Sequence, residues 1–277
     1  MIFSLEGTEG IIETEQDIKE FVDQEGIRII TFSHLNDDPD LGGAAFLSGS
    51  GAFLNLAPWI HQHVLPSGPK CEDTVVNPKG LTDEGKKLAR MLVNHKVWID
   101  LTHASDATQR DLIPIMREAG QPLLYTHAVL RKHHGAERGL AQWQIDEIKK
   151  NPNSGLIGLL PSEKYLENTK VPKPQCACDD PPGCTGGIHY AVAQYNEMAN
   201  EIGAKNIMLG SDTNGAVPHL KPTECSSSGT SIDREGFWNI GQTRELWESM
   251  KSAGASIPVN TNPGEHFLEK WSLLWKK

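Results

Sequence analysis

Short apolar runs alternate with amphipathic segments along this chain, and that alternation constrains the fold more than any other feature of the sequence. The segments between the runs place apolar side chains three or four positions apart, which is helical spacing. Strands that alternate with helices are typical of a parallel sheet, so the sequence predicts an α/β fold. The six runs that read as strands are Ile2–Leu5, Ile27–Phe32, Val97–Leu101, Pro122–Tyr125, Gly155–Leu160 and Asn206–Gly210.

Residues with capping chemistry bound the helical segments. Thr14 and Ser105 stand where helices should begin, because their hydroxyls can accept hydrogen bonds from the first free N–H groups. Gly26, Gly120 and Gly203 stand where helices should end, because glycine adopts the left-handed cap conformation at little cost. Further helices are expected over residues 82–94 and 141–150 and in two C-terminal segments, whereas residues 36–79 read as a long irregular stretch.

Six strand–helix units are two short of the eight that close a (β/α)8 barrel. At about 30 residues for each unit, the missing pair would lie before residue 1. We therefore expect a TIM-barrel type fold that is incomplete at its N-terminus. No linker or low-complexity tract interrupts the pattern, which favours a single domain over residues 1–277.

Composition narrows the classes of partner. The net charge is −10, so the chain has no basic footprint for nucleic acid. No apolar run approaches the roughly 18 residues that span a bilayer, so no transmembrane segment is expected. Residues Met1–Gly7 lack the basic start of a signal peptide, which favours a cytoplasmic location, although a start upstream of Met1 stays open. A homodimer also stays open.

Four of the expected strands lead into a residue that could bind metal. Glu6, His103, His127 and Asp212 each follow a different strand by a few positions at most. In a parallel barrel the carboxyl ends of all strands meet at one face, so these side chains should converge. Carboxylates and imidazoles are zinc ligands. The sequence therefore indicates a zinc site at this face.

Each of these residues alone has a structural explanation. A histidine after a strand is more often a hydrogen-bonded loop residue than a ligand, and Asp212 could cap a helix. Glu6 could stabilise a turn. The coincidence of four suitable residues at one topological position favours the metal site over these explanations.

Several short motifs resemble the membrane dipeptidase family. The segment 98–105, Trp-Ile-Asp-Leu-Thr-His-Ala-Ser, is similar to that family's "IDLSH.S" block. Residues 124–128, Leu-Tyr-Thr-His-Ala, resemble its "SHS" strand end. Weaker likenesses occur at residues 4–7, 31–36, 80–85 and 210–215, the last of which resembles its "GSDFDG" strand end, and all the blocks follow the family's order along the chain.

The resemblance implies a (β/α)8 hydrolase with two zinc ions. It implies that Glu6 bridges the ions and that His103 and His127 complete one site. Asp212 would lie beside the second ion and take the proton of the attacking water. Zinc lowers the pKa of bound water to about 7, which makes a nucleophile available at neutral pH.

The resemblance also implies two substrate contacts. Arg138 matches the arginine that receives the substrate's carboxylate, a role that a planar guanidinium suits because it can bind a carboxylate through two hydrogen bonds. By chemistry alone Arg131 is an equal candidate, and Arg138 could be a solvated surface charge. His34 matches the histidine that polarises the scissile carbonyl, and its structural alternative is a loop residue beside Asp37 and Asp38.

One part of the family's pattern has no counterpart. The family carries a His-x-Asp pair on its first strand, and only five residues precede Glu6. The chain could be a fragment, a shortened homologue, or a chain whose ligands come from another copy, and we favour the fragment. Whether one or two zinc ions bind is therefore left open.

The expected function is that of a zinc-dependent dipeptidase-like hydrolase that cleaves an amide bond of a small carboxylate-bearing substrate. Two alternatives remain: a different amide, ester or lactam hydrolase, and a catalytically dead homologue that acts as a binding or structural protein. The loops at 36–79 and 161–187 should shape the pocket, because βα loops set specificity in barrels. Cys176, Cys178 and Cys184 favour a surface loop with one disulfide over a further metal site, because their spacing is unlike that of zinc sites.

Overall fold

The computed structural model describes residues 2–64, 68–169, 187–213, 217–223, 230–259 and 261–275. The chain forms two compact units. Unit 1 comprises Met1–Thr126, Gly135–Leu156 and Glu269–Lys277, and unit 2 comprises His127–His134 and Ile157–Leu268. The assignment of residues 1–277 to one domain stays a prediction, and Cys176, Cys178 and Cys184 lie outside the described residues.

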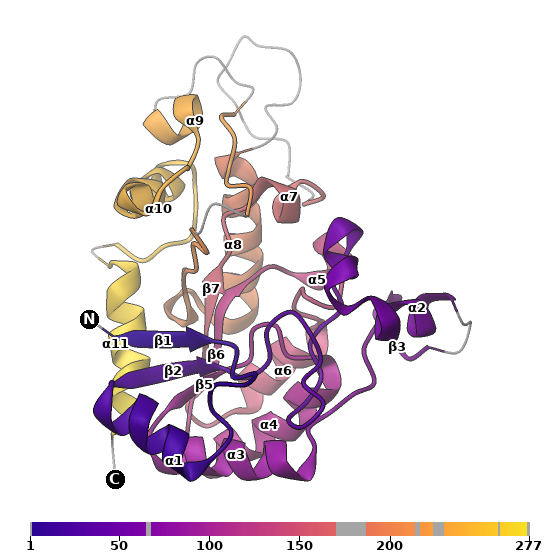
Figure 1. Ribbon diagram of the computed structural model, residues 1–277. Coiled ribbons are helices and arrows are strands. Elements are labelled where there is room, and N and C mark those ends of the chain that lie inside the picture. Colours follow the sequence, from indigo (N-terminus) through magenta and orange to yellow (C-terminus); the bar gives the residue numbers. More distant parts are fainter. Residues whose placement is uncertain are drawn as a thin grey trace. The chain divides into compact units, whose positions relative to one another are not determined.

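A six-stranded parallel sheet confirms the predicted fold class (Figure 1). Its strands follow one another in chain order, as the predicted strand–helix alternation requires. Among the described strands the sheet is open, so the barrel is not closed. The order is β1 (Phe3–Glu6), β2 (Ile27–Thr31), β5 (Trp98–Asp100), β6 (Leu123–Ala128), β7 (Gly155–Leu159) and β8 (Ile207–Leu209).

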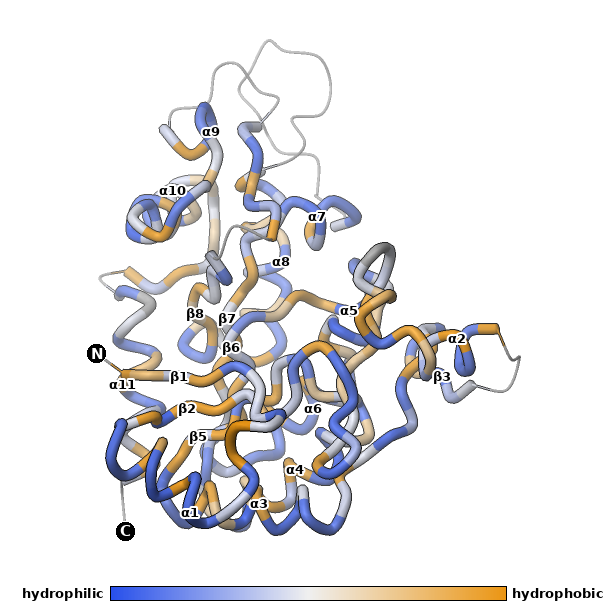
Figure 2. The backbone as a smooth tube through the Cα atoms, viewed as in Figure 1, coloured by the Kyte–Doolittle hydropathy of each residue, from blue (hydrophilic) through white to orange (hydrophobic). Residues whose placement is uncertain are grey.

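The core of unit 1 lies between its strands and the amphipathic helices that connect them. Every residue of β5 is buried, whereas β1 is the edge strand and leaves Phe3 53% exposed. Figure 2 shows the apolar character of the strands and the alternating faces of the helices. An interior strand is buried on both faces, which explains why the consecutive residues Trp98 and Ile99 of β5 are both apolar.

Two capped helices pack side by side in unit 1 (Figure 1). α3 (Asp83–Asn94) begins where the Thr82 hydroxyl accepts from Gly85 N–H at 3.0 Å. α4 (Asp106–Glu118) begins where Ser105 accepts from Thr108 N–H at 3.0 Å. Ser105 therefore caps α4 as predicted, and Thr82 caps the helix that was expected over residues 82–94. α6 (Gln142–Lys150) follows as expected.

The helix expected after Thr14 is present, but most of it is a π-helix rather than an α-helix. Thr14 and Asp17 form a capping box, and α1 (Glu15–Asp17) is a single turn. The chain then widens into the π-helical segment η1 (Ile18–Gln24). The wider turn keeps Ile18 and Val22 fully buried, so the apolar face predicted from the sequence is used although the helix type is not the predicted one.

The prediction of an irregular stretch over residues 36–79 was wrong. It contains the 3-10 segment η2 (Gly49–Asn55), α2 (Leu56–Val64) and an antiparallel hairpin of β3 (Lys70–Cys71) and β4 (Thr74–Val75). The hairpin turns at Glu72 and Asp73, which both have positive φ values, of 49° and 63°. Such a two-residue turn is usually signalled by Asn-Gly or Asp-Gly, and that signal is missing here.

Unit 2 is built around the long helix α8 (Ile188–Ile202). α8 packs against α10 (Thr243–Ser252), where Tyr195 meets Trp247 edge to face at 5.9 Å between ring centroids. Unit 2 also holds β8, and its short helices are α5 (Arg131–His134), α7 (Glu163–Leu166) and α9 (Ser231–Glu235). α11 (Pro263–Leu273) begins in unit 2 and ends in unit 1.

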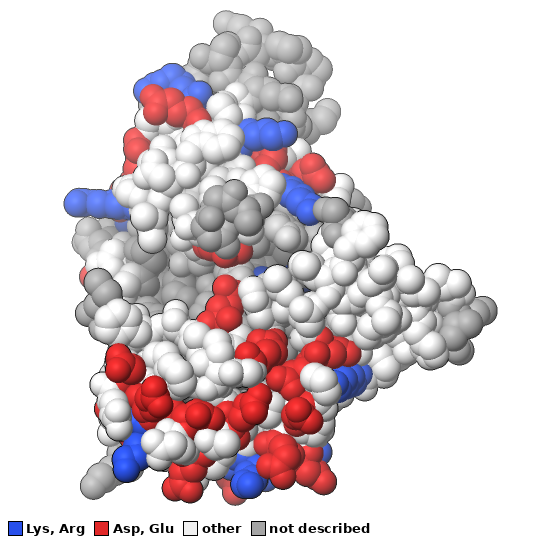
Figure 3. Space-filling view, viewed as in Figure 1, with Lys and Arg blue, Asp and Glu red and all other residues white. Residues whose placement is uncertain are grey.

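The charge of the surface agrees with the acidic composition. Figure 3 shows carboxylates gathered over the part of unit 1 that carries α1 and α3. No helix in the described ranges has both the length and the apolar content needed to cross a bilayer.

A buried carboxylate connects the segment between β2 and α3 to the rest of unit 1. Glu137 is 2% exposed, and its oxygens accept from the N–H groups of Phe46, Asn77 and Asp106 at 2.8, 2.9 and 2.8 Å. Burial, with the nearby Asp106 carboxylate, raises the pKa of Glu137 to about 8. This side chain therefore joins two parts of this segment to the start of α4.

Replacing Glu137 by glutamine should destabilise unit 1 by about 1–3 kcal/mol, because the amide nitrogen cannot accept a backbone N–H. The raised pKa means that folded Glu137 keeps its proton above the pH at which an unfolded glutamate loses it. The contribution of Glu137 to the free energy of unfolding should therefore fall as the pH rises from about 5 to about 8. Denaturant unfolding of both proteins at pH 5 and pH 8 measures this, with exposed Glu118→Gln as control. A wild-type advantage that grew with pH would contradict it.

Candidate metal centre

Glu6 is the last residue of β1 and pairs in register with Thr31 of β2. The chain leaves the strand immediately afterwards, at Gly7, which has a φ of 94°. A Cβ atom at this position would lie 2.5 Å from Oε2 of Glu9. Glycine therefore allows the strand to end at Glu6, with the carboxylate at the carboxyl edge of the sheet.

His103 follows β5 in a strained backbone conformation. Its φ is 68°, in the left-handed region that residues other than glycine seldom adopt. Its carbonyl accepts from Ala45 N–H at 2.6 Å, and the ring is 8% exposed. Strain of this kind costs about 1–3 kcal/mol and is found most often at functional sites.

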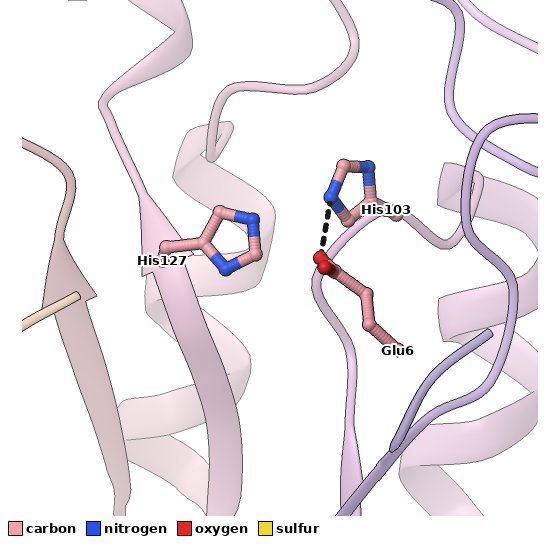
Figure 4. A group of neighbouring side chains, drawn as sticks. All are labelled: Glu6, His103 and His127. Atoms are coloured by element: carbon pink, nitrogen blue, oxygen red, sulfur yellow. Dashed lines mark ion pairs between the residues drawn. The ribbon is translucent and has the colours of Figure 1, made fainter. Parts of the chain in front are cut away.

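His127 lies on β6, directly after Thr126, and is 7% exposed. The strand was predicted to end at Tyr125, so His127 belongs to the strand itself rather than to the loop after it. Figure 4 shows its ring directed toward the Glu6 carboxylate, which His103 also approaches. One donor atom from each of Glu6, His103 and His127 lies within 4.8 Å of the other two.

Within unit 1, His34 and Arg138 also gather around His103. Nε2 of His103 is 3.1 Å from Oε1 of Glu6, and Nε2 of His34 is 3.7 Å from the same oxygen. The two imidazoles meet edge to face at 4.5 Å between centroids. Arg138 Nε donates to Nδ1 of His103 at 3.1 Å. Sequence reasoning named all four of these residues, and the structure brings them together.

Burial lowers the pKa of His103 well below its usual value, and the charges of Arg138 and His34 lower it further. His103 is therefore neutral at physiological pH. A neutral imidazole is the form that coordinates a metal ion, because a protonated ring has no free lone pair.

Asp212 pairs with His127 in unit 2. Its Oδ2 is 3.8 Å from Nε2 of His127, and its side chain is 15% exposed. Asp212 also has a positive φ, of 46°. Two of the four predicted ligands, His103 and Asp212, thus both have a left-handed backbone conformation.

Sequence reasoning missed Glu9. Its Oε1 accepts from the N–H of His34 at 3.0 Å, which fixes the loop that carries this histidine. The nearby Thr8 hydroxyl donates to the carbonyl of Phe32 at 2.8 Å. The segment after β1 is therefore bound to the segment after β2. A carboxylate that contacts a backbone group has no signature in sequence, so no pattern could have indicated it.

The donor set of Glu6, His103 and His127 fits a zinc ion. Zinc bonds of about 2.0–2.2 Å in a tetrahedral site separate ligand atoms by roughly 3.4 Å. Nε2 of His103 and Oε1 of Glu6 are already 3.1 Å apart, and the separations that reach up to 4.8 Å need to shorten by at most about 1.4 Å. Two of the donors are buried imidazoles and the third is a carboxylate. Three protein ligands leave a fourth position open, which is the pattern of catalytic zinc sites.

Residues 66–228 match the sequence profile of the membrane dipeptidase family, peptidase family M19. The matched segment covers more than half of the chain and includes His103, His127 and Asp212. The chain belongs to the membrane dipeptidase family. The resemblance drawn from short motifs is thereby confirmed.

Solved structures with the same fold include bacterial metallopeptidases. A metallopeptidase from Rhodobacter sphaeroides, liganded with a phosphinate mimic of the dipeptide L-Ala-D-Ala, matches with 18% identity and a TM-score of 0.63. The alignment covers 99% of this chain and 62% of that one. The probable dipeptidase PvdM from Pseudomonas aeruginosa matches with 15% identity and a TM-score of 0.66, over 99% of this chain and 68% of that one.

An amidohydrolase from Pseudomonas aeruginosa shares the fold as well, with 14% identity and a TM-score of 0.65. The alignment covers 100% of this chain and 73% of that one. For comparison, this chain spans 62% of the length of the Rhodobacter metallopeptidase. At these identities the likeness shows a shared fold.

Replacing Arg138 by alanine should raise the pKa of His103 in the metal-free protein, because it removes a nearby positive charge that opposes protonation. An NMR titration of the imidazole Cε1–H signals measures this shift. Arg90→Ala is the control, since Arg90 forms an exposed ion pair with Glu118. An unchanged or lowered pKa in the Arg138 variant would show that the contact with His103 does not form in solution.

Proposed function

We propose that this chain is the metal-binding part of a zinc-dependent dipeptidase-like hydrolase, which cleaves an amide bond of a small substrate that carries a carboxylate. The observation that carries the proposal is the group formed by Glu6, His103 and His127, whose donor atoms lie within 4.8 Å of one another. Membership of the membrane dipeptidase family supports the reaction class. The dipeptide mimic in the Rhodobacter metallopeptidase supports the substrate class.

Glu6, His103 and His127 would hold the zinc ion. Bound zinc supplies activation of water and polarisation of a carbonyl group. Asp212 would take the proton of the attacking water, and its Oδ2 lies 3.8 Å from Nε2 of His127. A general base has to come within hydrogen-bond reach of the proton that it takes. His34 would steady the negative charge that develops on the carbonyl oxygen.

Arg138 would bind the substrate's carboxylate. In the structure its guanidinium contacts both ring nitrogens of His103, at 3.1 and 3.3 Å. If Nε2 of His103 binds the metal, Nδ1 carries the proton and cannot accept from Arg138. The guanidinium then has to leave the ring, and its planar set of donors becomes available to an anion.

Three further assignments stay proposals. A second zinc ion would use Asp212, and a homodimer and a cytoplasmic location have the sequence alone as support. A homologue without activity would contain no zinc and hydrolyse no dipeptide, so the experiment below separates it from the hydrolase.

The purified protein should contain one or two zinc ions for each chain and should hydrolyse dipeptides. His103→Ala should reduce kcat/KM by more than about 100-fold, because even the hydrogen-bond partners of ligands are worth 10–100-fold. Metal analysis and a dipeptide panel, with and without a chelator, measure both properties. His95→Ala is the matched control, since His95 pairs with Asp23 on the surface. Hydrolysis that survived both the chelator and the His103 change would refute the assignment.

A further inference from the structure

Asp100 is a fully buried carboxylate at the end of β5, three positions before His103. Its Oδ1 accepts from the N–H groups of Thr102 and Thr126, at 3.1 and 2.9 Å. Its Oδ2 accepts from the hydroxyls of Thr31 and Thr126, at 2.7 and 2.6 Å. Four hydrogen bonds saturate both oxygens, which a buried carboxylate needs because an unsatisfied one is costly.

Each of these threonines is directly linked to one member of the candidate metal group. Thr31 is the partner of Glu6 in the pairing of β1 with β2. Thr102 precedes His103, and Thr126 precedes His127. One side chain therefore joins the carboxyl ends of β2, β5 and β6. β5 leads to His103, β6 contains His127, and β2 pairs with β1, which ends at Glu6.

β5 ends at Asp100, whereas β6 continues to Ala128. The Asp100 carboxylate links the backbone just beyond β5 to β6 by accepting from the N–H groups of Thr102 and Thr126. The hydroxyls of these two threonines are also 3.3 Å apart. The chain enters the left-handed conformation of His103 from this fixed point.

We propose that Asp100 is a positioning residue, which sets the spacing of Glu6, His103 and His127 and thereby the affinity of this group for zinc. Asp100 acts through the three threonines and contacts neither metal nor substrate. The proposal rests on the proposed function in one respect: it takes the group to be a zinc site.

The test compares zinc affinity with the stability of the metal-free protein. Asp100→Asn keeps the shape of the side chain but removes its charge and turns one oxygen into an N–H₂ donor. The N–H groups of Thr102 and Thr126 cannot accept from this donor, and the hydroxyls of Thr31 and Thr126 would have to change from donors to acceptors. The dissociation constant for Zn²⁺, measured on the full chain by competition with a chromophoric chelator, should rise about 10- to 100-fold. The visible spectrum of the Co²⁺-loaded protein should change as well, because it reports the coordination geometry.

Gln121→Ala is the matched control. Gln121 is buried at the opposite end of β5, where its Nε2 donates to Val97 C=O at 2.7 Å. This change should lower the melting temperature of the metal-free protein and leave the zinc dissociation constant within about twofold. A loss of zinc affinity in Asp100→Asn that Gln121→Ala does not share supports positioning over general destabilisation.

Thr126→Val and Thr126→Ser keep the proposal testable if Asp100→Asn does not fold. Valine removes the hydroxyl bond to Asp100 Oδ2 and serine keeps it, so valine should weaken zinc binding and serine should restore it. Equal zinc affinity in Thr126→Val and Thr126→Ser, or in Asp100→Asn and wild type, would overturn the positioning role.

Failure of the proposed function gives a different result. A wild-type chain that bound no zinc would overturn both proposals. A wild-type chain that bound zinc without hydrolysing dipeptides would overturn only the hydrolase, because the positioning role is read from affinity and from the Co²⁺ spectrum.

Discussion

Parallel hydrogen bonding of β1, β2, β5 and β6 is the constraint on which the candidate metal centre depends. The register joins Glu6 to Thr31, Thr31 to Asp100, and Asp100 to Leu124. Glu6, Thr31 and Asp100, which are far apart in the chain, therefore end their strands at the same level, and His103 and His127 each follow this level by three positions. A shift of one position in any pairing would turn a ligand to the other face of the sheet, since side chains alternate along a strand.

Electrostatics at this edge are set by burial as much as by charge. The His103 ring is held neutral by the loss of solvent around it and by the cation of Arg138. Asp100, only three residues earlier, is fully buried and keeps all its acceptors occupied. Two neighbouring side chains thus offset the free-energy cost of burial in different ways. His103 is neutral, whereas Asp100 accepts hydrogen bonds at both of its oxygens.

The strands and the convergence of Glu6, His103 and His127 could be predicted because they follow from periodicity and topology. The turn at Glu72 and Asp73 could not, because these residues adopt left-handed conformations without a glycine or asparagine signal. The functions of Asp100 and Glu137 were hidden for another reason. A buried carboxylate is stabilised by backbone N–H groups that only the folded chain brings to it, as Phe46 N–H donates to Glu137. Because every residue type except proline has a backbone N–H, no sequence pattern indicates such partners.

The left-handed backbone at His103 has an evolutionary consequence. Asparagine and glycine tolerate this conformation better than histidine does, so a descendant that had no use for a cation would gain stability by exchanging His103 for either of them. A relative that keeps histidine at this position gives up that stability. If His103 binds a metal ion, as we propose, the residue at this position therefore marks which relatives of the chain still bind metal through it.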